Sequence, residues 1–154
     1  MKSQFFLSFS MLERCIETCP DQLWNKKLSG FVFWQQLIHA LTGIHSWLKE
    51  EKLEEIPSFA IYSGKNVFPD FGYDPEIMLT KTDVHILFRE TKRTAEKWFN
   101  GKDDDWLKKP IFNTFTNFDN TLSHLRHLMY HAGHCEAIFR ENNIPPGDYL
   151  DYLG

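Results

Sequence analysis

Apolar residues recur at every third or fourth position in four segments of the chain, which is the spacing of an amphipathic α-helix with one buried face. Turn and capping residues separate these segments and indicate where each helix begins or ends. The four predicted helices run from about residue 4 to residue 19, from residues 29–30 to about residue 51, from a cap at Thr82 or Asp83 to Asn100-Gly101, and from a cap at Asn117 or Asp119 to about residue 141.

Each predicted helix has its own apolar stripe, and the chain is long enough for these stripes to share one core. The stripe residues are, in chain order, Phe5, Phe9, Leu12, Ile16 and Cys19; Phe31, Trp34, Ile38, Leu41 and Leu48; Val84, Leu87, Thr91, Ala95 and Trp98; and Leu122, Leu125, Met129, Ala132 and Phe139. We therefore expect an all-α four-helix bundle that forms a single domain over residues 1–154. The long connection over residues 52–80 permits an up-down-down-up arrangement.

Composition and charge exclude several classes of partner. The chain carries 17 Lys and Arg against 21 Asp and Glu and has no basic run longer than two residues, so we expect no nucleic-acid partner. No stretch approaches the roughly 20 apolar residues that span a bilayer, so we expect no membrane partner. The three cysteines lack CxxC spacing and are interpreted as reduced, packed thiols of a cytoplasmic protein.

Four histidines, His124, His127, His131 and His134, are spaced three, four and three residues apart in the fourth predicted helix. On a helix this spacing places them on one stripe, and the i, i+4 pair His127 and His131 can converge on one divalent metal ion. The alternative is a row of solvated or hydrogen-bonded histidines. The metal site is the sharpest hypothesis that the sequence offers.

A third ligand would come from another helix, and the second predicted helix offers His39 and His45. Spacing alone favours His45, because it falls at the centre of the apolar stripe. A ligand beside a cleft belongs at the edge of such a stripe, which is where His39 lies. His85 lies off the stripe of the third helix and is interpreted as a solvated residue.

Two segments resemble the DinB/YfiT-like superfamily. The run His127-Leu-Met-Tyr-His131-Ala-Gly-His134 is similar to its last-helix signature, in which a histidine, three residues and a second histidine precede one residue and Gly-Gln. The run Phe33-Trp-Gln-Gln-Leu-Ile-His39-Ala-Leu41 is similar to the segment that provides the family's first ligand. The long connection and the order of four helices also fit, so the resemblance covers nearly the whole chain.

The resemblance implies an up-down-down-up bundle in which His39, His127 and His131 hold one divalent metal ion, which is nickel, zinc or iron. It implies a metal-dependent enzyme with a small-molecule substrate, a transferase or isomerase that uses a low-molecular-weight thiol as cosubstrate. It also implies a homodimer, for which we expect exposed apolar positions on the first helices. The alternatives are a hydrolase that uses metal-bound hydroxide and a metal- or ligand-binding bundle without turnover. The catalytic residues remain unassigned.

One position departs from the family pattern, because His134 stands where the family commonly has glutamine. We expect His134 to support the ligands or the helix packing, or to compete as a ligand. Cys135 beside it is interpreted as a buried packing thiol. Aromatic residues of the long connection either wall a pocket over the metal ion or cover one end of the core. They are Phe59, Tyr62, Phe68, Phe71 and Tyr73.

Overall fold

The computed structural model describes residues 1–28, 30–48, 64, 67, 69–72 and 74–150. Of these described residues 65% are helical, and the few strands are short. The chain is therefore mostly α-helical, as the apolar spacing predicts. Within the described ranges, no helix combines the length and apolar character needed to cross a membrane.

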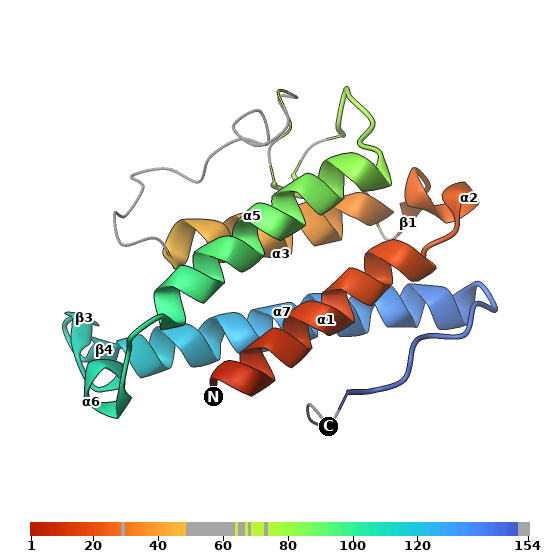
Figure 1. Cartoon of the computed structure of the whole chain (residues 1–154). Coiled ribbons are helices and arrows are strands. Elements are labelled where there is room, and N and C mark those ends of the chain that lie inside the picture. The colour runs from red at the N-terminus through yellow and green to blue at the C-terminus, as the bar shows by residue number, and fades with distance from the viewer. Residues whose placement is uncertain (29, 49–63, 65–66, 68, 73, 151–154) are drawn as a thin grey trace.

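Four long helices correspond to the four predicted segments. They are α1 (Lys2–Thr18), α3 (Phe33–Trp47), α5 (Lys81–Phe99) and α7 (Asn117–Glu141). Helix α1 packs against α7 and α5, and α3 packs against the same two helices. In Figure 1, α1 and α7 run in one direction along the molecule, while α3 and α5 run in the opposite direction. The packing of α3 on α7 brings together the two segments that carry the candidate ligands.

Short elements join the long helices. They are α2 (Asp21–Trp24), the antiparallel pair β1 (Lys27–Leu28) and β2 (Phe31–Val32), α6 (Asp104–Leu107), and the antiparallel pair β3 (Pro110–Phe112) and β4 (Phe115–Thr116). The predicted start of the second helix at residues 29–30 is wrong. Gly30 has a φ of +97° and lies between β1 and β2, a backbone conformation that favours glycine, so α3 begins only after this hairpin.

Two helix starts also differ from the predicted caps. The hydroxyl of Thr80 accepts a hydrogen bond from the backbone N–H of Asp83 at 3.2 Å, and the Asp83 carboxylate accepts one from the backbone N–H of Thr80 at 2.8 Å. Thr116 and Asp119 form the same reciprocal pair at the start of α7, at 3.2 and 2.9 Å. Each aspartate is therefore the third residue of its helix. The cap is the threonine three residues earlier, Thr80 in α5 and Thr116 in α7.

The predicted stripes of α1, α3 and α5 are buried in the core, but the predicted stripe of α7 is only partly so. Leu122 is 39% exposed, while His124, Leu128, His131 and Cys135 are buried. The main apolar stripe predicted for this helix is therefore rotated from the buried face. The histidine row, although polar, faces the interior of the molecule.

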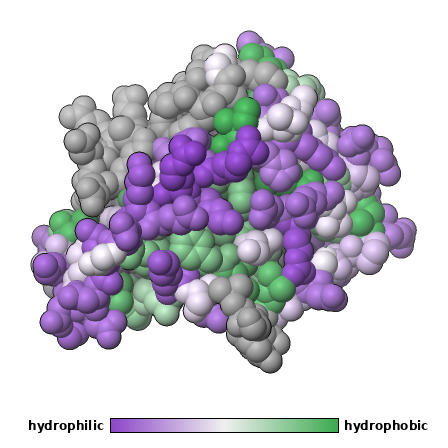
Figure 2. Space-filling view, viewed as in Figure 1, coloured by the Kyte–Doolittle hydropathy of each residue, from purple (hydrophilic) through white to green (hydrophobic). Residues whose placement is uncertain are grey.

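The solvent-facing surface is polar over α5 and more apolar over α7. In Figure 2, hydrophilic side chains form a band over α5, and apolar side chains are visible between this band and α1. No large apolar side chain of α1 is exposed, whereas Phe118, Leu122 and Tyr130 of α7 are exposed. Of the first two long helices, α1 therefore exposes no large apolar side chain and α3 exposes Trp47, and the homodimer stays a prediction.

Candidate metal centre

Three histidine rings meet between α3 and α7. One ring nitrogen from each of His39, His127 and His131 lies within 4.8 Å of the ligand atoms of the other two. The Nε2 atoms of His127 and His131 are 2.9 Å apart. An ion with bonds of about 2.1 Å needs ligand nitrogens about 3 to 3.4 Å apart, so adjustments on the order of 1 Å would complete the set. The three residues named from the sequence are thus the three that the structure brings together.

Two of the three rings have a defined proton position. His131 Nδ1 contacts the Oε1 atom of Gln36, and His39 Nδ1 lies 2.7 Å from the carbonyl oxygen of Pro69. Because these oxygens only accept hydrogen bonds, each Nδ1 must carry the proton and donate it. The lone pair of each ring is then on Nε2, the tautomer that a metal ligand requires.

The long connection contributes directly to the position of His39. The carbonyl of Pro69 accepts the hydrogen bond from this ring, and the ring of Phe71 stacks on it at a centroid distance of 4.5 Å and an interplanar angle of 27°. Phe71 also packs on Phe31 at 4.9 Å. Of the two alternatives for the connection aromatics, Phe71 lies beside the histidine cluster, where it packs on a candidate ligand. The remaining four, Phe59, Tyr62, Phe68 and Tyr73, lie outside the described residues.

Burial keeps the rings of α7 neutral. It lowers the pKa of His131 to about 3 and the pKa of His127 to about 4, because a charged imidazolium is poorly solvated there. Repulsion from neighbouring histidine rings is the second, smaller cause of both shifts. Both rings are therefore uncharged at neutral pH, with one nitrogen lone pair free, as a metal ligand requires.

A cavity of about 480 Å³ opens beside the histidine cluster. Its lining residues are His39, Gly43, Trp47, Pro69, Asp70, His124 and His127. Glycine at position 43 allows α3 to approach α7 here, because a Cβ atom would lie 3.3 Å from Cε1 of His127. The cluster thus borders a space large enough for a small molecule.

The other histidines do not join the cluster. His45, which spacing favoured, is buried, and its Nδ1 lies 3.2 Å from the hydroxyl oxygen of Thr94. Its ring therefore faces α5 and not the cluster. His134 packs edge-on against Phe31 at 5.5 Å, one turn beyond the cluster. His85 is half-buried in α5.

The cysteines are packing residues. Cys15, Cys19 and Cys135 are free and buried, and burial raises the pKa of Cys19 to about 12. The pKa of Cys135 is also well above its usual range, because Cys15 hydrogen-bonds to it and the site is desolvated. The thiols of Cys19 and Cys135 therefore stay protonated at neutral pH, and the interpretation of Cys135 as a buried packing thiol is confirmed.

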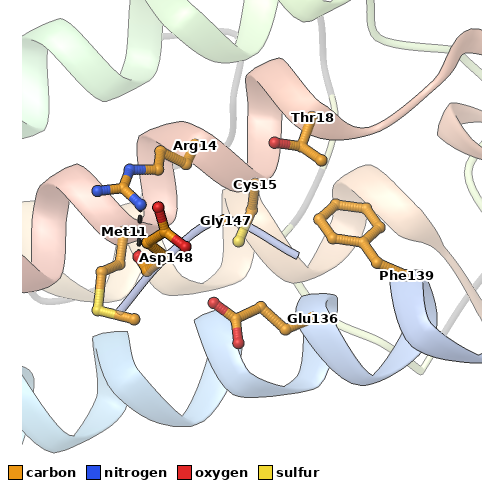
Figure 3. A pocket seen from close by; sticks show the side chains of 8 residues that line it. All are labelled: Met11, Arg14, Cys15, Thr18, Glu136, Phe139, Gly147 and Asp148. Carbon is orange, nitrogen blue, oxygen red and sulfur yellow. Dashed lines mark hydrogen bonds between the residues drawn. The ribbon is translucent and has the colours of Figure 1, made fainter. Parts of the chain in front are cut away.

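A second, very small cavity lies where the C-terminal segment crosses α1. Figure 3 shows the guanidinium of Arg14 directed at the chain near Asp148, whose carbonyl oxygen accepts its hydrogen bond, with Cys15 and Glu136 on the two facing helices. The cavity measures about 10 Å³, which is room for about one water molecule. It is therefore part of the packing and not a substrate site.

Sequence reasoning missed the partners that orient the rings. Glu136 and Asp119 share the helix with the ligands, yet Asp119 accepts a hydrogen bond from Thr116 at the start of α7 and Glu136 pairs with Arg140 at 3.4 Å. The acceptors are Gln36 and the Pro69 carbonyl. Gln36 could have been noticed, because an amide inside the apolar start of α3 needs a buried partner.

The assignment of the metal centre rests on the sequence and the structure of this chain alone. Comparisons with protein-family models, with curated proteins and with solved structures find no significant match to this chain.

Proposed function

We propose that this chain is a divalent-metal-binding protein with a DinB-like four-helix bundle of up-down-down-up connectivity, and that it acts on a small molecule. His39, His127 and His131 would hold the ion through Nε2. The observation that carries the proposal is the convergence of these three rings within 4.8 Å, with the tautomers of two of them fixed for coordination. The opposed directions of the helix pairs support the connectivity.

The donor set favours an open coordination site. Three neutral imidazoles are typical of catalytic zinc centres, which retain a free position, and imidazole also suits nickel and iron. An ion bound by neutral ligands keeps its double charge and would make a bound water or thiol acidic enough to act as a nucleophile near neutral pH. Gln36 and Pro69 would hold two rings in place, while the cavity beside His127 would admit the reactant.

The reaction we favour is a transfer or isomerisation that uses a low-molecular-weight thiol, on the basis of the sequence resemblance. A metal-dependent hydrolase is the second candidate, because the same open position would activate water. A binding protein without turnover is the third. A reaction of the metal-loaded protein with thiols and an electrophile separates the first candidate from the other two.

The metal centre is tested by elemental analysis of protein purified without a histidine tag. We expect one divalent ion per chain, and His127→Ala or His131→Ala should abolish stoichiometric metal. His39→Ala is the decisive variant, because it separates a three-histidine centre from the helical pair alone. If His39→Ala retains the ion as tightly as the parent, this ligand set is wrong.

Two histidines serve as matched controls, since each sits on a helix of the same molecule but outside the cluster. His45→Ala should reduce the free energy of unfolding, because the ring is buried and bonded to Thr94, yet it should retain the ion. His85→Ala should change neither property. A loss of metal in either control would show that the three-ring geometry is not the source of binding.

A further inference from the structure

His124 is a buried histidine that the metal centre does not use. It lies one turn before His127 on α7, with the two ring centroids 6.2 Å apart, and its side chain is only 8% exposed. It lines the 480 Å³ cavity together with Trp47, whose ring centroid is 6.3 Å away. Its Nδ1 atom is buried and has no hydrogen-bond partner among the residues that the structure describes.

This unpartnered nitrogen indicates how the ring is protonated. A buried N–H without an acceptor is rarer and costlier than a buried acceptor without a donor. The favoured tautomer therefore places the lone pair on the enclosed Nδ1 and the proton on Nε2. Of the two ring nitrogens only Nδ1 is fully enclosed without a partner, so Nε2 is the nitrogen that can meet a ligand in the cavity that His124 lines. His124 thus presents to the cavity a hydrogen-bond donor, Nε2–H, that has no acceptor in the described part of the chain.

Trp47 supplies the second property of the cavity. Its side chain is 44% exposed, so a large apolar surface is open where the cavity meets solvent. Gly43 and Pro69 add further apolar wall. A ligand here would meet an ion at one end, an N–H donor one helical turn away, and an aromatic surface at the rim.

We propose that this cavity is the substrate site and that His124 is a specificity-determining residue for it. The ligand class is a small molecule with a metal-directed end and, after a short spacer, a carbonyl-type oxygen that accepts from His124 Nε2–H. Its apolar part lies against Trp47. The assignment rests on the proposed metal centre at the inner end of the cavity.

The test compares two thiols on cobalt-loaded protein. N-acetylcysteamine carries an amide oxygen, and 1-pentanethiol has the same chain length without it. The sulfur-to-cobalt absorption band gives a dissociation constant for each without any assay of turnover. His124→Phe should weaken N-acetylcysteamine binding about fivefold, the value of one neutral hydrogen bond, and leave 1-pentanethiol within about twofold. His124→Gln, whose amide keeps a donor, should retain the preference, and Trp47→Leu should weaken both thiols alike.

A second measurement needs no metal. Ring nitrogen spectra of histidine-labelled protein, assigned with the His124→Phe variant, should show the Nε2–H tautomer at position 124. A proton on Nδ1, an equal effect of His124→Phe on the two thiols, or failure of either thiol to reach the bound cobalt would overturn the assignment. Protein that binds no cobalt would instead contradict the metal centre, before any thiol is added, and the substrate site would fall with it.

Discussion

Replacing Gln36 with leucine should weaken metal binding, although Gln36 is not a ligand. Its side chain is 1% exposed, and its Oε1 atom is the acceptor for His131 Nδ1–H. Without this acceptor the ring is free to rotate or to move its proton to Nε2, the atom that must bind the ion. Loss of a partner that orients a ligating histidine typically costs about 10- to 100-fold in metal affinity.

The same change should also destabilise the metal-free protein. It leaves the buried Nδ1–H of His131 without an acceptor, which costs about 1–3 kcal/mol of unfolding free energy. For a chain of this size that loss corresponds to a decrease in melting temperature of roughly 2–4 °C per kcal/mol. Gln36→Glu should preserve affinity, because its carboxylate still accepts from Nδ1–H.

Affinity is best measured by competition with a chromophoric zinc chelator, and stability by thermal melts with and without zinc. Thr94→Val is the matched control, because it removes the hydroxyl that lies 3.2 Å from the buried His45, outside the cluster. This control should lose stability and keep its zinc affinity. If Gln36→Leu binds zinc as tightly as the parent, or if Thr94→Val loses affinity equally, the orienting role of Gln36 is wrong.

Three further predictions follow from the site and the surface. The pKa values of His127 and His131 fall from 6.5 in the unfolded chain to about 4 and about 3 in the fold, so the unfolded state takes up more protons below pH 6.5. Urea titrations of metal-free protein should therefore show the unfolding free energy decreasing as pH falls from 6.5 towards 4, and a flat profile would contradict the buried, neutral rings. Gly43→Ala should leave the stability of the helix equal or up to about 1 kcal/mol higher. It should nevertheless reduce zinc affinity on the order of threefold or more, because the added Cβ would lie 3.3 Å from Cε1 of His127. Unchanged zinc affinity would show that the close approach of Gly43 to His127 is not needed. Sedimentation at micromolar concentration tests the homodimer, which a monomer would exclude.

The helices and the ligand pair on α7 could be predicted because both depend on local periodicity. Buried positions on α1, α3 and α5 repeat with the helical period, and His127 and His131 are neighbours on any helix. The hairpin before α3 was missed, because strands of two residues are too short to show an alternating pattern. The buried face of α7 was placed only in part, because histidines there count as polar in a periodicity argument although His124 and His131 are buried.

The choice between His39 and His45 could not be made from spacing. Both lie on α3, and the more central position in the apolar stripe belongs to His45. The structure separates them by their partners, since His45 is bonded to Thr94 of α5, whereas His39 meets the rings of α7. Which neighbouring helix each face of α3 contacts is a property of the assembled fold and is not encoded in the pattern of one helix.

The hydrogen bond between His39 and Pro69 has a consequence for how this protein tolerates change. The acceptor is a main-chain oxygen, 30 positions from the ring in sequence, and every amino acid has one. A scan that replaces side chains one at a time along the connection would therefore leave this support in place and pass over it. Removing or inserting a single residue just before position 69 would shift the oxygen by several ångströms. Apart from Phe71, whose ring stacks on His39, tolerance of substitution combined with intolerance of length change is thus the expected signature of this segment.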